Sequence, residues 1–182
     1  MNKIKYLFLF LILVSCISLY GCGYTTRAYV GPYKSIYTAP FRNKIDISNY
    51  RSEGSDYKTY YPLLESTITQ AIVNRFIFDG SLKSYKEENA DLILKGELIS
   101  YQRGALKYAD NNEDVDEYRV TLIVNISLYR TSDGELIWQK DGFAGDSSYF
   151  TTGSYAKSEK AALDDAISDL ARRVVEAVVE AW

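Results

Sequence analysis

The densest group of reactive side chains in this sequence is an acidic run from Asp110 to Glu117. Two carboxylates about 5 to 10 Å apart can cleave a glycosidic bond. Alternating Asp and Asn can instead begin a calcium loop, but Val115 stands where that loop needs glycine and Thr121 where it needs a bidentate acid. The simpler interpretation is a solvated hairpin tip. A carboxylate-dependent hydrolase centred on residues 113–117 stays open as an alternative.

The chain contains no histidine. This absence excludes Ser-His and Cys-His nucleophile pairs and imidazole ligands for zinc. We therefore predict that the protein is not an enzyme and holds neither a metal nor a cofactor.

The two cysteines lie near the N-terminus, at the end of a segment with the features of an export signal. Lys3 and Lys5 precede an apolar run from Tyr6 to Val14, and the small Gly21 precedes Cys22. Cys22 resembles the modified cysteine of the lipobox of bacterial lipoproteins. That resemblance implies that residues 1–21 are removed as a signal peptide, and that residues 22–182 form the mature chain, acylated on Cys22. Several acyl chains, each contributing about 0.8 kcal/mol per buried CH₂, make a lasting membrane anchor.

Two alternatives for this segment stay open. Cys16 follows Leu13-Val14-Ser15, which fits a lipobox slightly better than Leu19-Tyr20-Gly21 does. An uncleaved membrane helix is also conceivable, because no charge occurs from Tyr6 to Thr26, although small and polar residues dilute that stretch. Gly23, rather than an aspartate, follows Cys22, and the resemblance to lipoproteins then implies the periplasmic side of the outer membrane.

Composition argues against a nucleic-acid partner. Removal of residues 1–21 takes two lysines and no acids, which leaves 19 basic and 24 acidic residues and a net charge of −5. A nucleic-acid binder needs a basic footprint, and the cations here are scattered among acids. The remaining 161 residues suit one domain that is stabilised by packing, since no disulfide can form with one cysteine.

Hydrophobic periodicity predicts the elements. Residues 34–39 form a β-branched and aromatic strand, and apolar residues at every fourth position predict a helix over 62–78. Alternation predicts strands over 92–98 and 118–129, the latter joined by a tight turn to a strand over 135–140. Ser158 can cap a long final helix. Residues 49–60 and 142–153 lack a period and are predicted to be irregular.

The order strand, helix, three strands, helix predicts an α+β fold. We expect a two-layer α/β sandwich with about four strands in a mixed sheet and two helices packed on one face. The opposite face of the sheet is then uncovered, and is either solvated surface or a docking surface. The residues that we place on this open face are Tyr101, Arg119, Asn125 and Tyr129.

Several short motifs, in order and spacing, resemble the LptE family of lipopolysaccharide-assembly lipoproteins. None of these motifs is a catalytic signature. They are Cys22-Gly23-Tyr24, Ala39-Pro40-Phe41-Arg42-Asn43-Lys44, Leu64-Glu65 through Phe78-Asp79-Gly80-Ser81-Leu82, Ala90-Asp91-Leu92-Ile93-Leu94-Lys95-Gly96-Glu97, Glu117-Tyr118-Arg119-Val120, Gly134-Glu135-Leu136-Ile137-Trp138 and Asp165-Ala166-Ile167-Ser168-Asp169-Leu170-Ala171. Tyr20 and the acidic run depart from the family pattern.

The resemblance implies an outer-membrane lipoprotein that plugs the large β-barrel LptD and assists insertion of lipopolysaccharide into the outer leaflet. The open-face residues named above would then contact the barrel. If lipopolysaccharide is bound directly, its phosphates need cations near strand ends. Our candidates flank the two hairpins and are Arg103, Lys107, Arg130 and Lys140. The rival interpretation is a lipid-anchored binding module of similar fold that activates a cell-wall synthase or belongs to a secretion complex.

Overall fold

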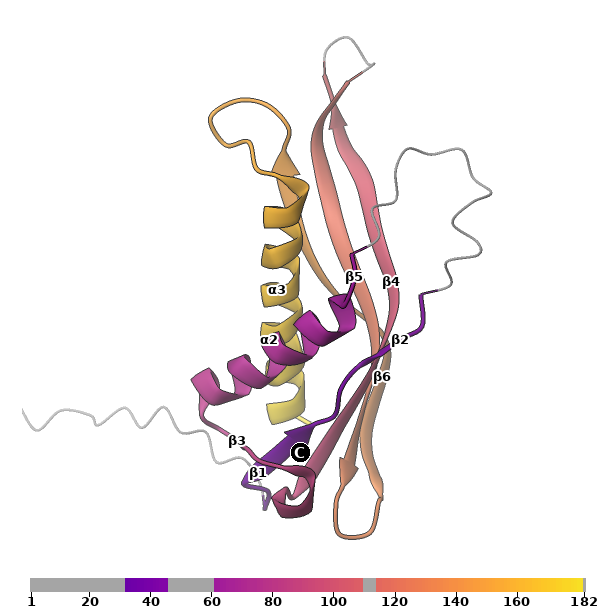
Figure 1. The fold of residues 1–182 in the computed structure, drawn as a ribbon, viewed down its shortest axis with the longest axis vertical. Helices are drawn as coiled ribbons and strands as arrows, with labels where there is room; N and C mark the ends of the chain where they lie inside the picture. The colour runs from indigo at the N-terminus through magenta and orange to yellow at the C-terminus, as the bar shows by residue number, and fades with distance from the viewer. Residues whose placement is uncertain (1–31, 46–60, 110–113, 182) are drawn as a thin grey trace, which may run out of the picture.

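The structure, a computed structural model, describes residues 32–45, 61–109 and 114–181. It consists of a six-stranded sheet and two helices that lie on one face of that sheet (Figure 1). The elements in chain order are β1 (Ser35–Thr38), β2 (Arg42–Asn43), α2 (Leu64–Asp79), β3 (Lys83–Ser84), the 3₁₀ helix η2 (Glu87–Asn89), β4 (Leu92–Tyr108), β5 (Val115–Arg130), β6 (Leu136–Phe150) and α3 (Glu159–Val179). The predicted two-layer α+β sandwich is confirmed, with two short strands more than expected.

The sheet combines an antiparallel meander with short parallel strands. Its order is β3-β1-β4-β5-β6, and β2 pairs with β4 beside β1. β1 and β2 both run parallel to β4, whereas β4, β5 and β6 are antiparallel neighbours. Gly134, in the left-handed conformation with φ 71°, makes the turn between β5 and β6, as expected for a residue without Cβ. Because the sheet contains both parallel and antiparallel pairs of strands, it is the mixed sheet that the sequence predicts.

Both helices bury the stripes that periodicity predicts. In α2 the buried residues are Leu64, Ile68, Ile72 and Phe76, and Gly80 ends the helix with φ 74°. α3 begins after Ser158, whose Oγ accepts a hydrogen bond of 3.2 Å from the Ala161 amide. Of the helices in the described ranges, none combines the length and apolarity that a membrane span requires.

β6 is longer than the sequence suggests. The prediction that residues 142–153 are irregular is wrong over most of that range, because β6 continues to Phe150. A bulge interrupts its pairing with β5 between Val124 and Ile126. The Gly142 amide at this bulge donates a 2.9 Å hydrogen bond to Asn125 Oδ1, which satisfies a group that the sheet leaves unpaired.

A bulge in β4 reverses the face on which one candidate residue lies. The register with β5 shifts between Leu98 and Ser100, so Tyr101 pairs with the buried Leu122. Tyr101 is only 7% exposed and belongs to the core beneath the helices. The prediction that Tyr101 lies on the open face is therefore wrong, since one extra residue moves every later side chain to the other face.

Two glycines let apolar groups approach the sheet closely. A Cβ added at Gly145 in β6 would lie 2.5 Å from the Leu170 Cβ and 2.6 Å from the Leu170 Cα of α3. At Gly96 in β4 the same addition would meet the ring of Phe41. Both contacts lie on the helix-covered face, where they allow dense packing.

Candidate binding groove on the open face of the sheet

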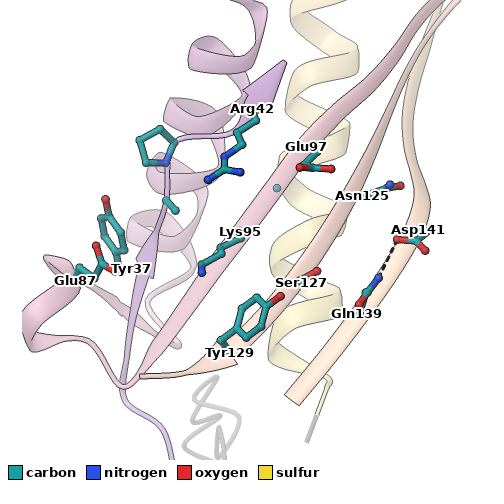
Figure 2. Close-up of a pocket in the computed structure, with 13 residues that line it drawn as sticks. Tyr37, Arg42, Glu87, Lys95, Glu97, Asn125, Ser127, Tyr129, Gln139 and Asp141 are labelled. Carbon is teal, nitrogen blue, oxygen red and sulfur yellow. Dashed lines mark hydrogen bonds between the residues drawn. The ribbon is translucent and has the colours of Figure 1, made fainter. Parts of the chain in front are cut away.

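The uncovered face of the sheet carries a groove of about 580 Å³. Figure 2 shows that side chains from β1, β2, β4, β5 and β6 surround it. Its lining residues are Tyr37, Ala39, Pro40, Arg42, Glu87, Lys95, Gly96, Glu97, Asn125, Ser127, Tyr129, Gln139 and Asp141. The lining is mostly polar, because the residues that alternate with the buried strand positions are polar.

The charged side chains of this groove have no ionic partner within the chain as described. Arg42 and Lys95 supply two positive charges, and Glu87, Glu97 and Asp141 supply three negative charges. None of the five belongs to an ion pair among the described residues. A surface with both signs and unused hydrogen-bonding groups favours a polar partner with complementary charges.

Aromatic and amide groups complete the floor of the groove. Lys95 Nζ lies 4.8 Å from the centroid of the Tyr129 ring, a cation–π contact that holds the lysine over the sheet. Gln139 Nε2 donates a 3.2 Å hydrogen bond to Asp141 Oδ1. Tyrosine and planar polar groups are typical of contact surfaces, because they combine apolar area with hydrogen bonding.

The structure brings two of the four predicted open-face residues together. Asn125 and Tyr129 both line the groove, whereas Arg119 lies on the same face of β5, nearer the hairpin tip. Tyr101 lies beneath the helices. Sequence reasoning missed Tyr37 and Arg42, because their place beside β4 depends on parallel pairing between segments distant in sequence.

A second polar cluster lies on the helix-covered side, at the start of α3. Glu159 Oε1 accepts hydrogen bonds from Tyr101 Oη at 2.6 Å and from Tyr61 Oη at 3.2 Å. Its other oxygen accepts from Arg103 Nη1 at 2.7 Å in a partly buried ion pair. Burial raises the pKa of Glu159, but the bonds from Tyr101 and Arg103 outweigh it and hold the pKa below its usual value. The group is a fixed anion at neutral pH.

Aromatic rings surround this carboxylate. Burial and the bond to Glu159 raise the pKa of Tyr101 far above its ordinary value. The rings of Tyr118 and Tyr149 stack with centroids 5.7 Å apart, and the Arg103 guanidinium lies 4.5 Å from the centroid of Tyr118. With both carboxylate oxygens of Glu159 hydrogen-bonded and its pKa lowered, this cluster ties α3 to β4 rather than serving as a general acid.

The four cation candidates do not form one site. Arg103 is engaged with Glu159, and Lys107 Nζ pairs with Asp116 at 3.1 Å. Arg130 contacts the Tyr33 hydroxyl at 3.0 Å and also pairs with two acids of the β5–β6 turn, contacts that raise its pKa. Lys140 makes no ion pair with a described residue, and its Nζ lies 5.5 Å from the Phe143 ring.

Three sequence predictions fall wholly or partly outside the described residues. One of them is that residues 49–60 are irregular, because residues 46–60 are not described. Residues 1–31, which contain Cys16 and Cys22, are not described, and residues 110–113 of the acidic run are not described either. In the rest of that run, Asp116 is committed to its pair with Lys107. The hydrolase and lipidation hypotheses therefore stay predictions.

The fold and the groove define a class of protein: a two-layer α+β domain whose open sheet face carries a polar groove. Residues 33–180 match the model of the family described as LptE, lipopolysaccharide-assembly. Because the match spans most of the chain, the protein belongs to the LptE family, as the motifs predicted. It is accordingly a member of a lipopolysaccharide-assembly family.

Solved structures share the fold at low sequence identity. The protein XCC0632 from Xanthomonas campestris has 10% identity and a TM-score of 0.50, over 85% of this chain and 88% of that chain. The hypothetical protein CT253 from Chlamydia trachomatis has 15% identity and a TM-score of 0.51, over 82% and 99%. A PelC dodecamer from Paraburkholderia phytofirmans has 15% identity and a TM-score of 0.47, over 85% and 95%. None of the curated proteins matches the sequence.

Proposed function

We propose that this protein is an outer-membrane lipoprotein that plugs an LptD-type β-barrel and assists insertion of lipopolysaccharide into the outer leaflet. In this proposal residues 1–21 are the signal peptide, and Cys22 carries the lipid on the periplasmic side. Residues 22–182 are the single mature domain. The proposal includes no bond-breaking step.

The observation that carries the proposal is the open groove, in a chain of the LptE family. Its five charged side chains have no ion-pair partner among the described residues, whereas the helix-covered face is closed by packing. The lumen of a large transmembrane barrel is polar, so it can supply complementary charges and hydrogen bonds. A lipid anchor keeps the domain near the membrane and raises its concentration at the barrel.

Among the four cation candidates, Lys140 is our choice for contact with lipopolysaccharide phosphates. Lys140 and Arg173 both lie 5.5 Å from the Phe143 ring, which concentrates positive charge at one place. Arg173 has only a long contact of 3.8 Å with Asp169. The other three candidates already have close carboxylate partners, so their release would oppose phosphate binding.

Affinity purification tests the barrel partner. A C-terminally tagged chain is purified from detergent-solubilised outer membrane, and the proteins recovered at equal stoichiometry are identified. We expect a single large barrel subunit. Recovery of a cell-wall synthase, of a self-assembled ring or of no partner would contradict the plug proposal and favour the rival binding-module function.

Charge reversal tests the groove as the contact surface. We expect Arg42→Glu combined with Lys95→Glu to weaken recovery of the barrel strongly while the domain stays folded. Lys160→Glu is the matched control, because Lys160 lies on the solvent side of α3. Equal recovery with the groove variant and the control would assign the barrel contact to another surface.

The lipid and the phosphate contact have separate readouts. Mass spectrometry of the N-terminal peptide is expected to show acylation that Cys22→Ser removes and Cys16→Ser leaves.

For lipopolysaccharide, we expect Lys140→Ala to reduce photo-crosslinking to the purified glycolipid, with Lys107→Ala as the control. Equal crosslinking by both variants would exclude Lys140 from the phosphate site.

A further inference from the structure

The C-terminal end of α2 exposes large apolar side chains that the fold does not use. Ile77 is 64% exposed, Phe78 is 80% exposed, and Tyr85, just beyond β3, is 51% exposed. Phe76 and Leu82, in the same stretch, are fully buried and already supply the core contacts. We call Ile77, Phe78 and Tyr85 the α2-end patch. The Phe78 ring lies 5.3 Å from the Arg75 guanidinium but outside the core. Exposed large apolar side chains outside the core can mark a contact surface.

This patch lies where the chain enters the domain. The Lys83 amide donates to the Lys34 carbonyl at 2.9 Å, and the Tyr85 amide donates to the Ile36 carbonyl at 3.0 Å. Both bonds hold β3 and the Tyr85 backbone beside β1, and Figure 1 shows that end of the sheet opposite the β6–α3 connection. Nine residues lie between Cys22 and Pro32, so the ten steps from one Cα to the next, at up to about 3.6 Å each, span at most roughly 36 Å.

Three lysines belong to or flank the paired strands β1 and β3 beside Tyr85. Lys34, Lys83 and Lys86 form no ion pair among the described residues. The acids nearby in sequence are Asp79, Glu87, Glu88 and Asp91, and Asp91 is committed to the Lys34 and Ser35 amides and the Ser35 hydroxyl. Lysines beside apolar and aromatic side chains suit a lipid headgroup region, where stems lie along the apolar boundary and ammonium groups reach phosphates.

We propose that the α2-end patch rests on the phospholipid surface of the leaflet that holds the lipid anchor. Phe78 and Ile77 enter the boundary between headgroups and acyl chains, and Tyr85 lies at headgroup depth. The three lysines contact lipid phosphates. The inference rests on the proposed anchoring at Cys22 and is independent of the barrel and of lipopolysaccharide.

Tryptophan quenching tests the depth of the patch. The acylated full-length mature chain is reconstituted in vesicles of phosphatidylethanolamine and phosphatidylglycerol with brominated acyl chains. Phe78→Trp is the probe, and Tyr155→Trp, at an 81% exposed position in the β6–α3 connection, is the matched control. The emission of Trp138 and Trp182 is subtracted by use of the wild-type chain. We expect a blue shift and quenching for the probe and neither for the control.

A second measurement separates the contribution of the α2-end patch to membrane binding from that of the lipid anchor. In the unacylated Cys22→Ser chain, we expect Phe78→Ser to weaken vesicle partitioning by about tenfold, as loss of one inserted aromatic side chain should. Tyr155→Ser should leave partitioning unchanged. An unquenched probe, or a photo-crosslink from position 78 to a protein partner, would overturn the proposal. Quenching without recovery of a barrel would retain this inference and refute only the plug function.

Discussion

On the helix-covered face of β5, Val120, Leu122, Val124, Ile126 and Leu128 are fully buried, whereas the residues between them lie on a face that stays partly exposed to solvent. The same strand therefore supplies a closed core on one side and a wall of the groove on the other. The two faces differ in what completes them. α2 and α3 complete the first, and no segment among the described residues completes the second.

The covered face should therefore determine the stability of the domain, and the open face should determine what it recognises. Apolar side chains on the covered face gain free energy from burial, so changes there should alter folding. Unpaired charges on the open face contribute little to stability, because water solvates them in the isolated domain. Paired substitutions on the two faces of one strand test this contrast.

The largest expected effect is at Leu122. Leu122→Asp would bury an unpaired carboxylate beneath α3 and should destabilise the domain by about 4 kcal/mol. Thr121→Asp is the matched control, because the adjacent residue lies on the open face and should change stability by less than about 0.5 kcal/mol. Urea unfolding measures both. A cooperative transition of wild-type midpoint for Leu122→Asp would refute the assigned faces.

The next largest effect is at the close approach of α3 to β6. Gly145→Ala places a methyl group against the Leu170 backbone and should destabilise the domain by about 1–3 kcal/mol. Gly104→Ala serves as the control, because nothing lies within 4 Å of a Cβ at that position of β4. Thermal unfolding should show a lower Tm for Gly145→Ala alone, and equal Tm values would mean that the helix can shift freely.

The contribution of Glu159, the carboxylate of the polar cluster at the start of α3, to the free energy of unfolding should depend on pH. Because the folded pKa of Glu159 is lowered, its stabilisation is present above the ordinary value of 4.5 and is lost as pH falls through the lower folded value. Glu159→Gln should cost about 1–2 kcal/mol at neutral pH. Its difference from wild type should shrink at low pH in urea titrations. A difference that is constant with pH would show that the charge of Glu159 contributes nothing.

The smallest expected stability effect is on the open face. Lys95→Glu with Arg42→Glu should lower the free energy of unfolding by no more than about 1 kcal/mol, because it removes only the exposed contact of Lys95 with Tyr129 and adds like charges that water screens, yet it should abolish the proposed barrel contact. Urea unfolding and co-purification on the same sample distinguish the two properties. A large loss of stability would mean that this face already contributes to folding, and the contrast between the faces would fail.

Local periodicity predicted the elements that pack by their own stripe or alternation. α2, α3 and the apolar face of β5 agree with prediction because their buried residues recur at the periods of a helix or a strand. The second half of β6 escaped prediction, because Asp141, Gly142, Gly145 and Asp146 interrupt the alternation while neighbours in β5 hold the strand. There, tertiary pairing overrides a weak local preference.

The groove could be predicted only in part, for a geometric reason. Asn125 and Tyr129 follow from the alternation of β5. Tyr101 could not be placed correctly, since the bulge after Leu98 has no clear sequence signal. Tyr37 and Arg42 reach the groove through parallel pairing of β1 and β2 with β4, which connects segments more than fifty residues apart, as the Ser35 and Asp91 contact illustrates.

That parallel pairing has a consequence for the order of folding. The β4–β5–β6 meander joins neighbouring segments through short turns, so its loops close at little entropic cost, whereas β1 must wait for β4 across a long intervening chain. We therefore expect the meander to acquire hydrogen-exchange protection first in pulse-labelled refolding, and β1 to acquire it last. The strand nearest the proposed anchor would then be the last to join the sheet, so the segment that holds the domain to its membrane is also the one that completes its fold.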